Sequence, residues 1–494
     1  MQLIEHLDRQ ACAFPERAAL IGEPAGASYS YAQLLREVAA IAAALRQREL
    51  RVLGLYADNG PAWLLVDLAC QAAGVTLVPL PAFFSQQQLA HTIDSSGMQA
   101  LLTDDCERFT ALEQVGEALA GVAGLAMIDI PTAAPVALPA QTAKITFTSG
   151  STGTPRGVCL SDETQLNTAA ALARQLELLG CARHLCLLPL ATLLENVAGA
   201  YTSWLLGGTV MAPGLARLGL SGSSQLDSAQ LCRCIDEYQP DSLILLPQIL
   251  KALVAQIQAG AWAPTRSLRF VAVGGGKVAP DLLRQARSHG LPVFEGYGLS
   301  ECGSVVALNL PGADRPGAAG RPLSHCEIAV RDGEVVVRGP RYLGYLNDAQ
   351  AGEEGEWLAT GDLGEFDRDG FLHITGRKKN LLISSFGRNI SPEWIESEIL
   401  LDPQVLQCVV LGDARPHCSA LIFAHPVAST EQIEQWLQSV NARLPDYAQV
   451  RNWAPLPAPL TFADGLLTAN GRPRRDAIAA RYQESIENLY RGAA

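Results

Sequence analysis

The strongest constraint on the fold of this chain is an alternation of short apolar strands with amphipathic helices. Residues 51–80, RVLGLYADNGPAWLLVDLACQAAGVTLVPL, predict a strand, a helix that starts near Asn59 and a second strand from Val75. Two such strands run parallel, because a helical crossover returns the chain to the same edge of the sheet. The same alternation recurs at residues 241–247, 268–276, 279–290 and 292–298. The sequence therefore predicts an α/β fold with doubly wound sheets.

The pattern changes after about residue 325 to alternating segments joined at Asp-Gly, which is a strong hairpin signal. Residues 327–339 and 364–377 predict antiparallel strands of this kind and a β-barrel-like part. Beyond Arg377–Asn380 the helices and strands are typical of a small α+β unit. We therefore expect two domains: a large multi-layer domain over residues 1–378 and a small mobile domain over residues 379–494.

Composition excludes several classes of protein. The net charge of −13 argues against nucleic acid as a partner, since binding to a phosphate backbone needs clustered Lys and Arg. The twelve cysteines are scattered without C-x-x-C spacing, which predicts reduced and mostly buried thiols in a cytoplasmic protein. The N-terminus lacks the apolar run of a signal peptide. The apolar region at 185–212 is interrupted by Pro189 and Glu195, so we expect no transmembrane segment.

The loop TFTSGSTGTPRGV at residues 146–158 indicates an anion site. Its glycines permit positive φ and close backbone approach, so successive N–H groups can converge on a polyphosphate, and the Ser and Thr hydroxyls add donors. A strand is expected to enter the loop and a helix to begin near Ser161. The loop is not a Walker A sequence, because no G-K-[ST] follows the glycines. A flexible surface turn is the alternative interpretation of the same composition.

Four motifs in order carry a family resemblance. The loop closely resembles the phosphate-binding signature of the adenylate-forming superfamily, which contains acyl-CoA synthetases, luciferases and the adenylation domains of peptide synthetases. GYGLSECGS (296–304), TGDLGEFDRDGFLHITGRKKNLL (360–382) and GRNISPEWIE (387–396) resemble its later motifs. Glu195, Asn196 and RKKN are similar to the long-chain fatty acid type of acyl-CoA synthetase.

The resemblance implies a reaction in two halves. A carboxylate attacks the α-phosphate of ATP to give acyl-adenylate and pyrophosphate, and a thiol then displaces AMP. The implied cofactors are ATP, Mg²⁺ and coenzyme A, or the phosphopantetheine of an acyl carrier protein. Both steps move negative charge, so the site needs fixed positive charge and hydrogen-bond donors.

The resemblance also implies residue roles. Glu301 would bind magnesium, Ser300 would donate to the α-phosphate, and Lys379 would be the hinge of the small domain. The nucleotide contacts would come from Thr148, Ser149, Gly150, Ser151, Thr152, Gly153, Arg156, Gly274, Gly275, Gly276, Glu295, Gly296, Tyr297, Gly298, Asp362 and Arg377. Taken without the family context, Asp362 is a turn former, Ser300 and Glu301 a helix cap, and RKK a solvated basic run.

The chain departs from the family pattern at two places. Arg472 stands where a lysine normally reaches the substrate carboxylate and the α-phosphate, and no lysine lies in the tail of the chain. Arginine keeps the charge but changes the reach and geometry. Thr192 stands where relatives carry a His or aromatic gate, and with Asn196 and Gly275 it is expected to line the acyl pocket.

Three functions stay open at this point. The favoured one is an ATP-dependent, AMP-forming acyl-CoA synthetase whose small-molecule substrate is a fatty, aryl or other apolar carboxylic acid. The second is an acyl-AMP ligase that loads a carrier protein. The third is a catalytically impaired homologue that binds nucleotide or acyl ligand, which Arg472 motivates.

Overall fold

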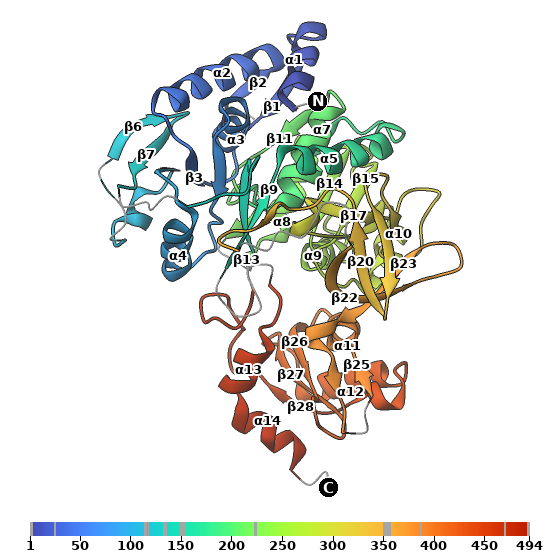
Figure 1. The fold of residues 1–494 in the computed structure, drawn as a ribbon. Coiled ribbons are helices and arrows are strands. Elements are labelled where there is room, and N and C mark those ends of the chain that lie inside the picture. Colours follow the sequence, from blue (N-terminus) through green and yellow to red (C-terminus); the bar gives the residue numbers. More distant parts are fainter. Residues whose placement is uncertain are drawn as a thin grey trace.

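The computed structural model describes residues 3–23, 26–112, 116, 118–131, 136–148, 155–221, 225–348, 357–385, 388–468 and 471–491. These residues form a large unit, blue to yellow in Figure 1, and a small unit, orange to red, which lies against one end of it. The expected α/β fold with a large and a small domain is confirmed.

The large domain contains a nine-stranded sheet. Its six central strands, β16 to β1, pair parallel, and antiparallel strands complete both edges. In spatial order the strands are β18 (Arg321–Pro322), β17 (Ser304–Leu308), β16 (Val293–Leu299), β15 (Phe270–Val273), β14 (Ser242–Leu245), β10 (Arg183–Leu185), β11 (Thr209–Met211), β1 (Ala18–Ile21) and β2 (Ser28–Ser30).

A second sheet has eight strands, of which the four central ones, β8, β4, β3 and β5, pair parallel. The βαβ unit predicted from residues 51–80 is β3, the following helix and β4. In spatial order the strands are β21 (Gly344–Tyr345), β9 (Arg156–Leu160), β8 (Lys144–Thr148), β4 (Thr76–Pro79), β3 (Val52–Tyr56), β5 (Ala100–Thr103), β7 (Leu125–Asp129) and β6 (Ala118–Val122).

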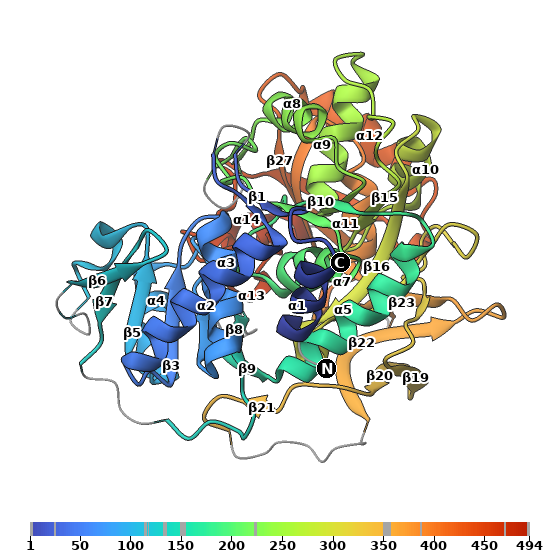
Figure 2. The same ribbon diagram turned by 90° about the horizontal axis from the view of Figure 1, so that it is seen from above.

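Helices pack between and around these sheets (Figure 2). The core that the two sheets share includes Leu20 and Val210 from the first, Leu53 and Leu77 from the second, and the buried face of α3 with Trp63. The helices of the large domain are α1 (Leu3–Ala13), α2 (Tyr31–Gln47), α3 (Pro61–Ala73), α4 (Gln86–Ser96), α5 (Asp162–Glu177), α6 (Leu193–Glu195), α7 (Thr202–Leu205), α8 (Ser228–Tyr238), α9 (Pro247–Gln258) and α10 (Pro280–Ser288).

A four-stranded antiparallel sheet forms the barrel-like part. It consists of β19 (Glu327–Arg331), β20 (Glu334–Arg338), β22 (Leu358–Phe366) and β23 (Leu372–Arg377). Both predicted Asp-Gly hairpins are present, since β19 pairs with β20 and β22 pairs with β23. Their turn glycines, Gly333 and Gly370, each take φ of +79°. Val337 packs against Val306, and Leu372 packs against Ala307, so this sheet covers β17.

The small domain packs its helices on a three-stranded sheet, and Ile395, Ile422 and Leu437 meet in its core. Its elements are β24 (Leu382–Ile383), β25 (Asn389–Ile390), α11 (Pro392–Ile399), β26 (Val405–Leu411), β27 (Cys418–Ala424), α12 (Thr430–Asn441), β28 (Val450–Pro455), α13 (Arg475–Arg481) and α14 (Gln483–Tyr490).

The apolar region at 185–212 is buried as expected, but it is more broken than one helix and one strand. A π-helix, Asn196–Tyr201, joins α6 to α7 before β11. Within the described residues no helix is long and apolar enough to cross a membrane. All twelve cysteines are free thiols; nine are buried, Cys326 is half-buried, and Cys12 and Cys106 are exposed.

Candidate active site

The phosphate-loop motif connects two paired strands. Thr148 ends β8 and Arg156 begins β9, and the two residues face each other in the antiparallel ladder. Helix α5 follows with Ser161 as its N-cap, as predicted, whereas strand β9 was not predicted. Residues 149–154 lie outside the described residues, so the positions of Ser149, Gly150, Ser151, Thr152 and Gly153 stay predictions. The hairpin fixes both ends of the loop beside each other, at the end of β8 and the start of β9.

Arg156 is exposed at the start of β9 and is held from two sides. Its guanidinium carbon lies 3.7 Å from the ring centroid of Tyr345, and Nη2 lies 3.3 Å from Oδ2 of Asp348. Stacking on an aromatic face suits the planar guanidinium better than it would suit a lysine ammonium. The cation is thus positioned beside the loop by a segment about 190 residues further along the chain.

Glu301 lies in a single 3-10 turn, Ser300–Cys302, at the end of β16. Its Oε1 accepts a hydrogen bond of 2.8 Å from the hydroxyl of Tyr345, and its carbonyl oxygen accepts one of 2.6 Å from the backbone N–H of Tyr342. Desolvation, followed by the charge of Glu301, raises the pKa of Tyr345. Arg156, Tyr345 and Glu301 therefore form one chain of contacts.

The sequence motifs do not include Tyr342 and Tyr345 among the site residues. The signal available in the sequence was the aromatic pair three residues apart in RYLGYLND (341–348). Nothing in that spacing identifies Glu301 or Arg156 as the contacts, because β21 reaches them only through its pairing with β9.

A second group of site residues surrounds Asp362 on β22. Its Oδ2 accepts a hydrogen bond of 2.8 Å from the hydroxyl of Tyr297, and its Oδ1 lies 2.9 Å from Nε of Arg377. Arg377 stands opposite Asp362 in the ladder between β22 and β23. Burial raises the pKa of Tyr297, and the charge of Asp362 raises it further, so the phenol stays protonated and donates. The structure thus brings together three predicted nucleotide contacts.

The glycine segment after β15 forms an open backbone surface. Gly275 has φ of +78°, and a Cβ added there would stand 2.9 Å from the Leu246 side chain. A Cβ on Gly274 would stand 3.2 Å from the carbonyl oxygen of Gly296. Side chains are therefore disfavoured at this surface, which leaves peptide planes against which a flat base can lie. Gly276 continues the surface toward Pro247.

Two residues that were predicted to contact the nucleotide, Glu295 and Gly298, make contacts within the protein. Glu295 is buried on β16, and its carboxylate accepts a hydrogen bond of 2.9 Å from the backbone N–H of Gly317. Burial raises the pKa of Glu295 to about 7. A Cβ on Gly298 would stand 1.9 Å from the carbonyl oxygen of Ser304, so this glycine is required by the bulge between β16 and β17.

Arg472 reaches the glycine surface from the small domain. Its Nε donates a hydrogen bond of 3.0 Å to the carbonyl oxygen of Gly275, and Nη2 donates to the same oxygen. Thr468 holds the turn that presents it, through bonds to the backbone N–H and carbonyl of Arg472. The guanidinium is close enough to Arg377 and Asp362 to interact with both charges. Arg472, which replaces the usual lysine of the tail motif, thus lies at the predicted nucleotide site.

Lys379 lies in the exposed 3-10 turn Lys378–Asn380, which links β23 of the large domain to β24 of the small one. This is the connection on which the hinge prediction depends. Its geometry is compatible with a hinge, since a short exposed turn can absorb changes in φ and ψ.

Thr192 and Asn196, which were expected at the acyl pocket, differ in their surroundings. Thr192 is half-buried as the residue before α6, and its hydroxyl donates to the carbonyl oxygen of Pro189 at 2.8 Å. Asn196 is buried in a network with an ion pair: it accepts from Lys144 and donates to Oδ2 of Asp67 at 2.9 Å. The structure therefore engages the Asn196 amide with Lys144 and Asp67.

His184, Cys186 and Glu195 form a buried group whose ligand atoms all lie within 4.8 Å of one another. The His184 Nε2 lies 2.6 Å from Oε1 of Glu195, and the other carboxylate oxygen accepts from the backbone N–H groups of Leu187 and Leu188. Because the imidazole and the carboxylate already have partners, we interpret the group as a hydrogen-bonded core network.

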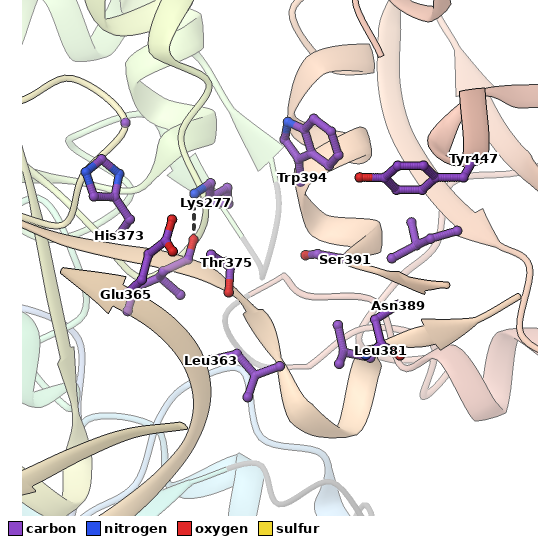
Figure 3. A pocket seen from close by; sticks show the side chains of 13 residues that line it. Lys277, Leu363, Glu365, His373, Thr375, Leu381, Asn389, Ser391, Trp394 and Tyr447 are labelled. Atoms are coloured by element: carbon purple, nitrogen blue, oxygen red, sulfur yellow. Dashed lines mark hydrogen bonds between the residues drawn. The ribbon is translucent and has the colours of Figure 1, made fainter. Parts of the chain in front are cut away.

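A cavity of about 440 Å³ lies between the two domains, next to the glycine segment 274–276. In Figure 3, Lys277, His373 and Glu365 line it from the large domain, and Trp394 and Tyr447 line it from the small one. Lys277 Nζ donates to the carbonyl oxygen of Ile374 at 2.8 Å. The cavity is therefore lined by residues of both domains.

Two family models match the chain: the AMP-binding enzyme model over residues 7–356 and the AMP-binding enzyme C-terminal domain model over residues 379–494. The chain belongs to the AMP-binding enzyme family, which confirms the resemblance to adenylate-forming enzymes.

The curated relatives differ in substrate and in coverage. The 2-succinylbenzoate–CoA ligase of Bacillus velezensis is 31% identical over 83% of this chain and 83% of its own length. A feruloyl-CoA synthase of Amycolatopsis is 27% identical over 92% and 94%. The long-chain-fatty-acid–CoA ligase FadD15 of Mycobacterium bovis is 32% identical, but over only 45% of this chain and 42% of its own. The match to this fatty acid ligase thus covers less than half of either chain.

Among solved structures, the o-succinylbenzoate CoA synthetase of Bacillus subtilis, in complex with its acyl-adenylate, superposes with a TM-score of 0.77. It is 25% identical, and the match covers 96% of this chain and 97% of that one.

Proposed function

We propose that this enzyme activates an aromatic monocarboxylic acid with ATP and transfers the acyl group to coenzyme A. The observation that carries the proposal is the contact of Arg472 with the Gly275 carbonyl, beside Tyr297, Asp362 and Arg377. It places a cation of the small domain at the glycine surface of the large one, and the family supplies the reaction class.

The reaction is an AMP-forming acid–thiol ligation. A carboxylate oxygen of the acid forms a bond to the α-phosphorus of ATP, and the bond to the bridging oxygen breaks as pyrophosphate leaves. The thiol sulfur then attacks the acyl carbonyl, loses its proton, and expels AMP. Relatives that are CoA ligases, and a related synthetase solved with ATP and magnesium, support ATP, Mg²⁺ and coenzyme A as the reactants and cofactor.

The residues fit this chemistry. Asp362 accepts the ribose hydroxyls, since each of its oxygens has a lone pair beyond its present bond. Arg156 and Thr148 hold the outer phosphates with the loop, and Ser300 donates to the inner one. Glu301 would hold magnesium, which would supply positive charge to the phosphates. Arg472 stabilises the negative charge that develops between the carboxylate and the α-phosphate.

The substrate class follows from charge and from the relatives. Residues 192–201, 246–249 and 273–276, which we place at the acyl pocket, contain one charged side chain, Glu195, and its carboxylate is bound by His184 and two backbone N–H groups. No side chain within these segments is a cation, and Lys144, which bonds to Asn196, is already paired with Asp67. The relatives that match most of the chain are named for aromatic acids. An apolar aromatic acid with one carboxylate satisfies both observations.

ATP–pyrophosphate exchange with a panel of acids tests the proposal. We expect the highest kcat/KM with benzoate or cinnamate derivatives, lower values with 2-succinylbenzoate, and the lowest with palmitate. Addition of coenzyme A to the best acid is expected to give the thioester, detected by chromatography. A preference for palmitate, or no exchange with any acid, contradicts the proposal. The comparisons give no support to a carrier-protein acceptor or to a role limited to binding.

A further inference from the structure

Individual side-chain contacts join the small domain to the large one at several places. Arg472 bonds to Gly275 at one point, and the rings of Phe83 and Phe462 meet edge to face with centroids 5.9 Å apart at another. The cavity of Figure 3 lies between the two domains, and contacts of this kind at its sides contribute to the orientation of the small domain.

Lys251 makes a third contact of a different type. It extends from α9 of the large domain, and its Nζ donates to two backbone carbonyl oxygens of the small domain, 2.8 Å to Asp402 and 3.0 Å to Val405. These carbonyls belong to the turn that follows α11. The neighbouring Leu401 packs against the core of the large domain, so the turn is held by an apolar and a polar contact together.

The Lys251 contact is less accessible to water than the Arg443–Asp281 ion pair at this interface. The Lys251 amine is half-buried, and hydrogen bonds from a charged donor out of bulk water contribute more than neutral ones. Burial lowers the pKa of Lys251 to about 8, which leaves most of the amine protonated at pH 7. The Arg443–Asp281 pair, 3.1 Å between Nη1 and Oδ2, is 41% and 33% exposed, and an ion pair this accessible is weak.

Helix α9 connects this contact to the active site. Its preceding residue, Leu246, lies against Gly275, and its first residue, Pro247, lies against Gly276. Lys251 and the carbonyl that receives Arg472 are therefore carried by adjoining parts of the large domain. A small domain held at Asp402 and Val405 is held in the orientation in which Arg472 reaches Gly275.

We propose that Lys251 is a positioning residue for the adenylation step, which fixes the small domain so that Arg472 stands at Gly275. The inference rests on the proposed function, in which Arg472 acts in the adenylation step. Lys251 does not need to touch a substrate. Its amine helps to place the Arg472 cation, which lies more than 200 residues away in the sequence.

Lys251→Met tests the proposal, because methionine fills a similar volume and cannot donate. Gln258→Met is the matched control, since Gln258 lies on the same helix and its side chain bonds to Gln285 of the large domain. In ATP–pyrophosphate exchange with the best acid, we expect Lys251→Met to lower kcat about tenfold, equivalent to about 1.4 kcal/mol, with KM for ATP changed less than about twofold. Lys251→Arg is expected to recover most of the loss.

A double-mutant cycle separates positioning from a general structural role. If Lys251 acts through Arg472, the Lys251→Met change should cost nothing further in an Arg472→Ala background. Additive losses in the cycle, or full exchange activity of Lys251→Met, overturn the proposal.

Hydrogen exchange gives a readout independent of activity. We expect faster exchange in Lys251→Met at residues 400–406 and around 472, with residues 52–79 and the Gln258→Met protein unchanged. Unchanged exchange at 400–406 overturns the proposal. If no acid supports exchange of pyrophosphate even in the unaltered protein, the proposed function fails, while the hydrogen-exchange result still decides whether Lys251 holds the domain.

Discussion

The guanidinium of Arg472 and the carbonyl oxygen of Gly275 are joined by a hydrogen bond of 3.0 Å from Nε, across 197 residues of sequence. Arg472→Ala removes this donor and its charge. We expect ATP–pyrophosphate exchange to fall at least about 100-fold, because stabilisation of developing charge in the transition state is lost. Arg472→Lys should retain more activity than Arg472→Ala. Equal exchange rates in Arg472→Ala and the unaltered protein would remove Arg472 from the site.

Tyr345→Phe removes the hydroxyl that bonds to Glu301 and keeps the ring beneath Arg156. Since residues that orient a metal ligand contribute to metal affinity, we expect half-maximal exchange to need about tenfold more Mg²⁺. The control is Tyr342→Phe, whose bond to Glu301 comes from the backbone and survives the change. A magnesium titration that matches the unaltered protein would show that Tyr345 does not orient Glu301.

Glu295→Gln should alter the pH dependence of stability. Burial raises the pKa of Glu295 from 4.5 to about 7, with Asp314 acting in the same sense and Gly317, Lys277 and Arg287 opposing it. The folded state therefore binds the proton more tightly, so stability from this group is full below pH 4.5 and is lost as the pH rises to about 7. At pH 8 the loss is about 3 kcal/mol.

Urea unfolding at pH 5 and pH 8 measures this effect. Glutamine cannot ionise. The unaltered protein should therefore lose stability relative to Glu295→Gln when the pH is raised from 5 to 8. A difference independent of pH would mean that Glu295 does not titrate in this range.

The Lys144–Asp67 ion pair, 2.8 Å between Nζ and Oδ1, is almost fully buried. Lys144→Met leaves Asp67 buried without its cation, which should lower the free energy of unfolding by about 3–5 kcal/mol. Lys378→Met, which breaks the exposed pair with Glu334, should change it by less than about 1 kcal/mol. Chemical denaturation of both variants makes the comparison, and similar losses would contradict the assignment of Lys144 to the core network.

The sequence by itself determined the elements and the local motifs. Residues 51–80 specified a βαβ unit, and the Asp-Gly pairs at 332–333 and 369–370 specified hairpins, because strand alternation, helix periodicity and turn chemistry are properties of consecutive residues. For the same reason Asp362 and Arg377, which face each other in a ladder, could be named together from one continuous motif.

Only the tertiary structure decided which distant residues meet. No local pattern places Tyr345 on Glu301, Lys251 on the carbonyls of Asp402 and Val405, or Arg472 on Gly275, since each contact depends on how strands are ordered and how the domains are oriented. It also placed Asn196 with Lys144 and Asp67, because burial of an ion pair requires further polar partners that the sequence does not identify.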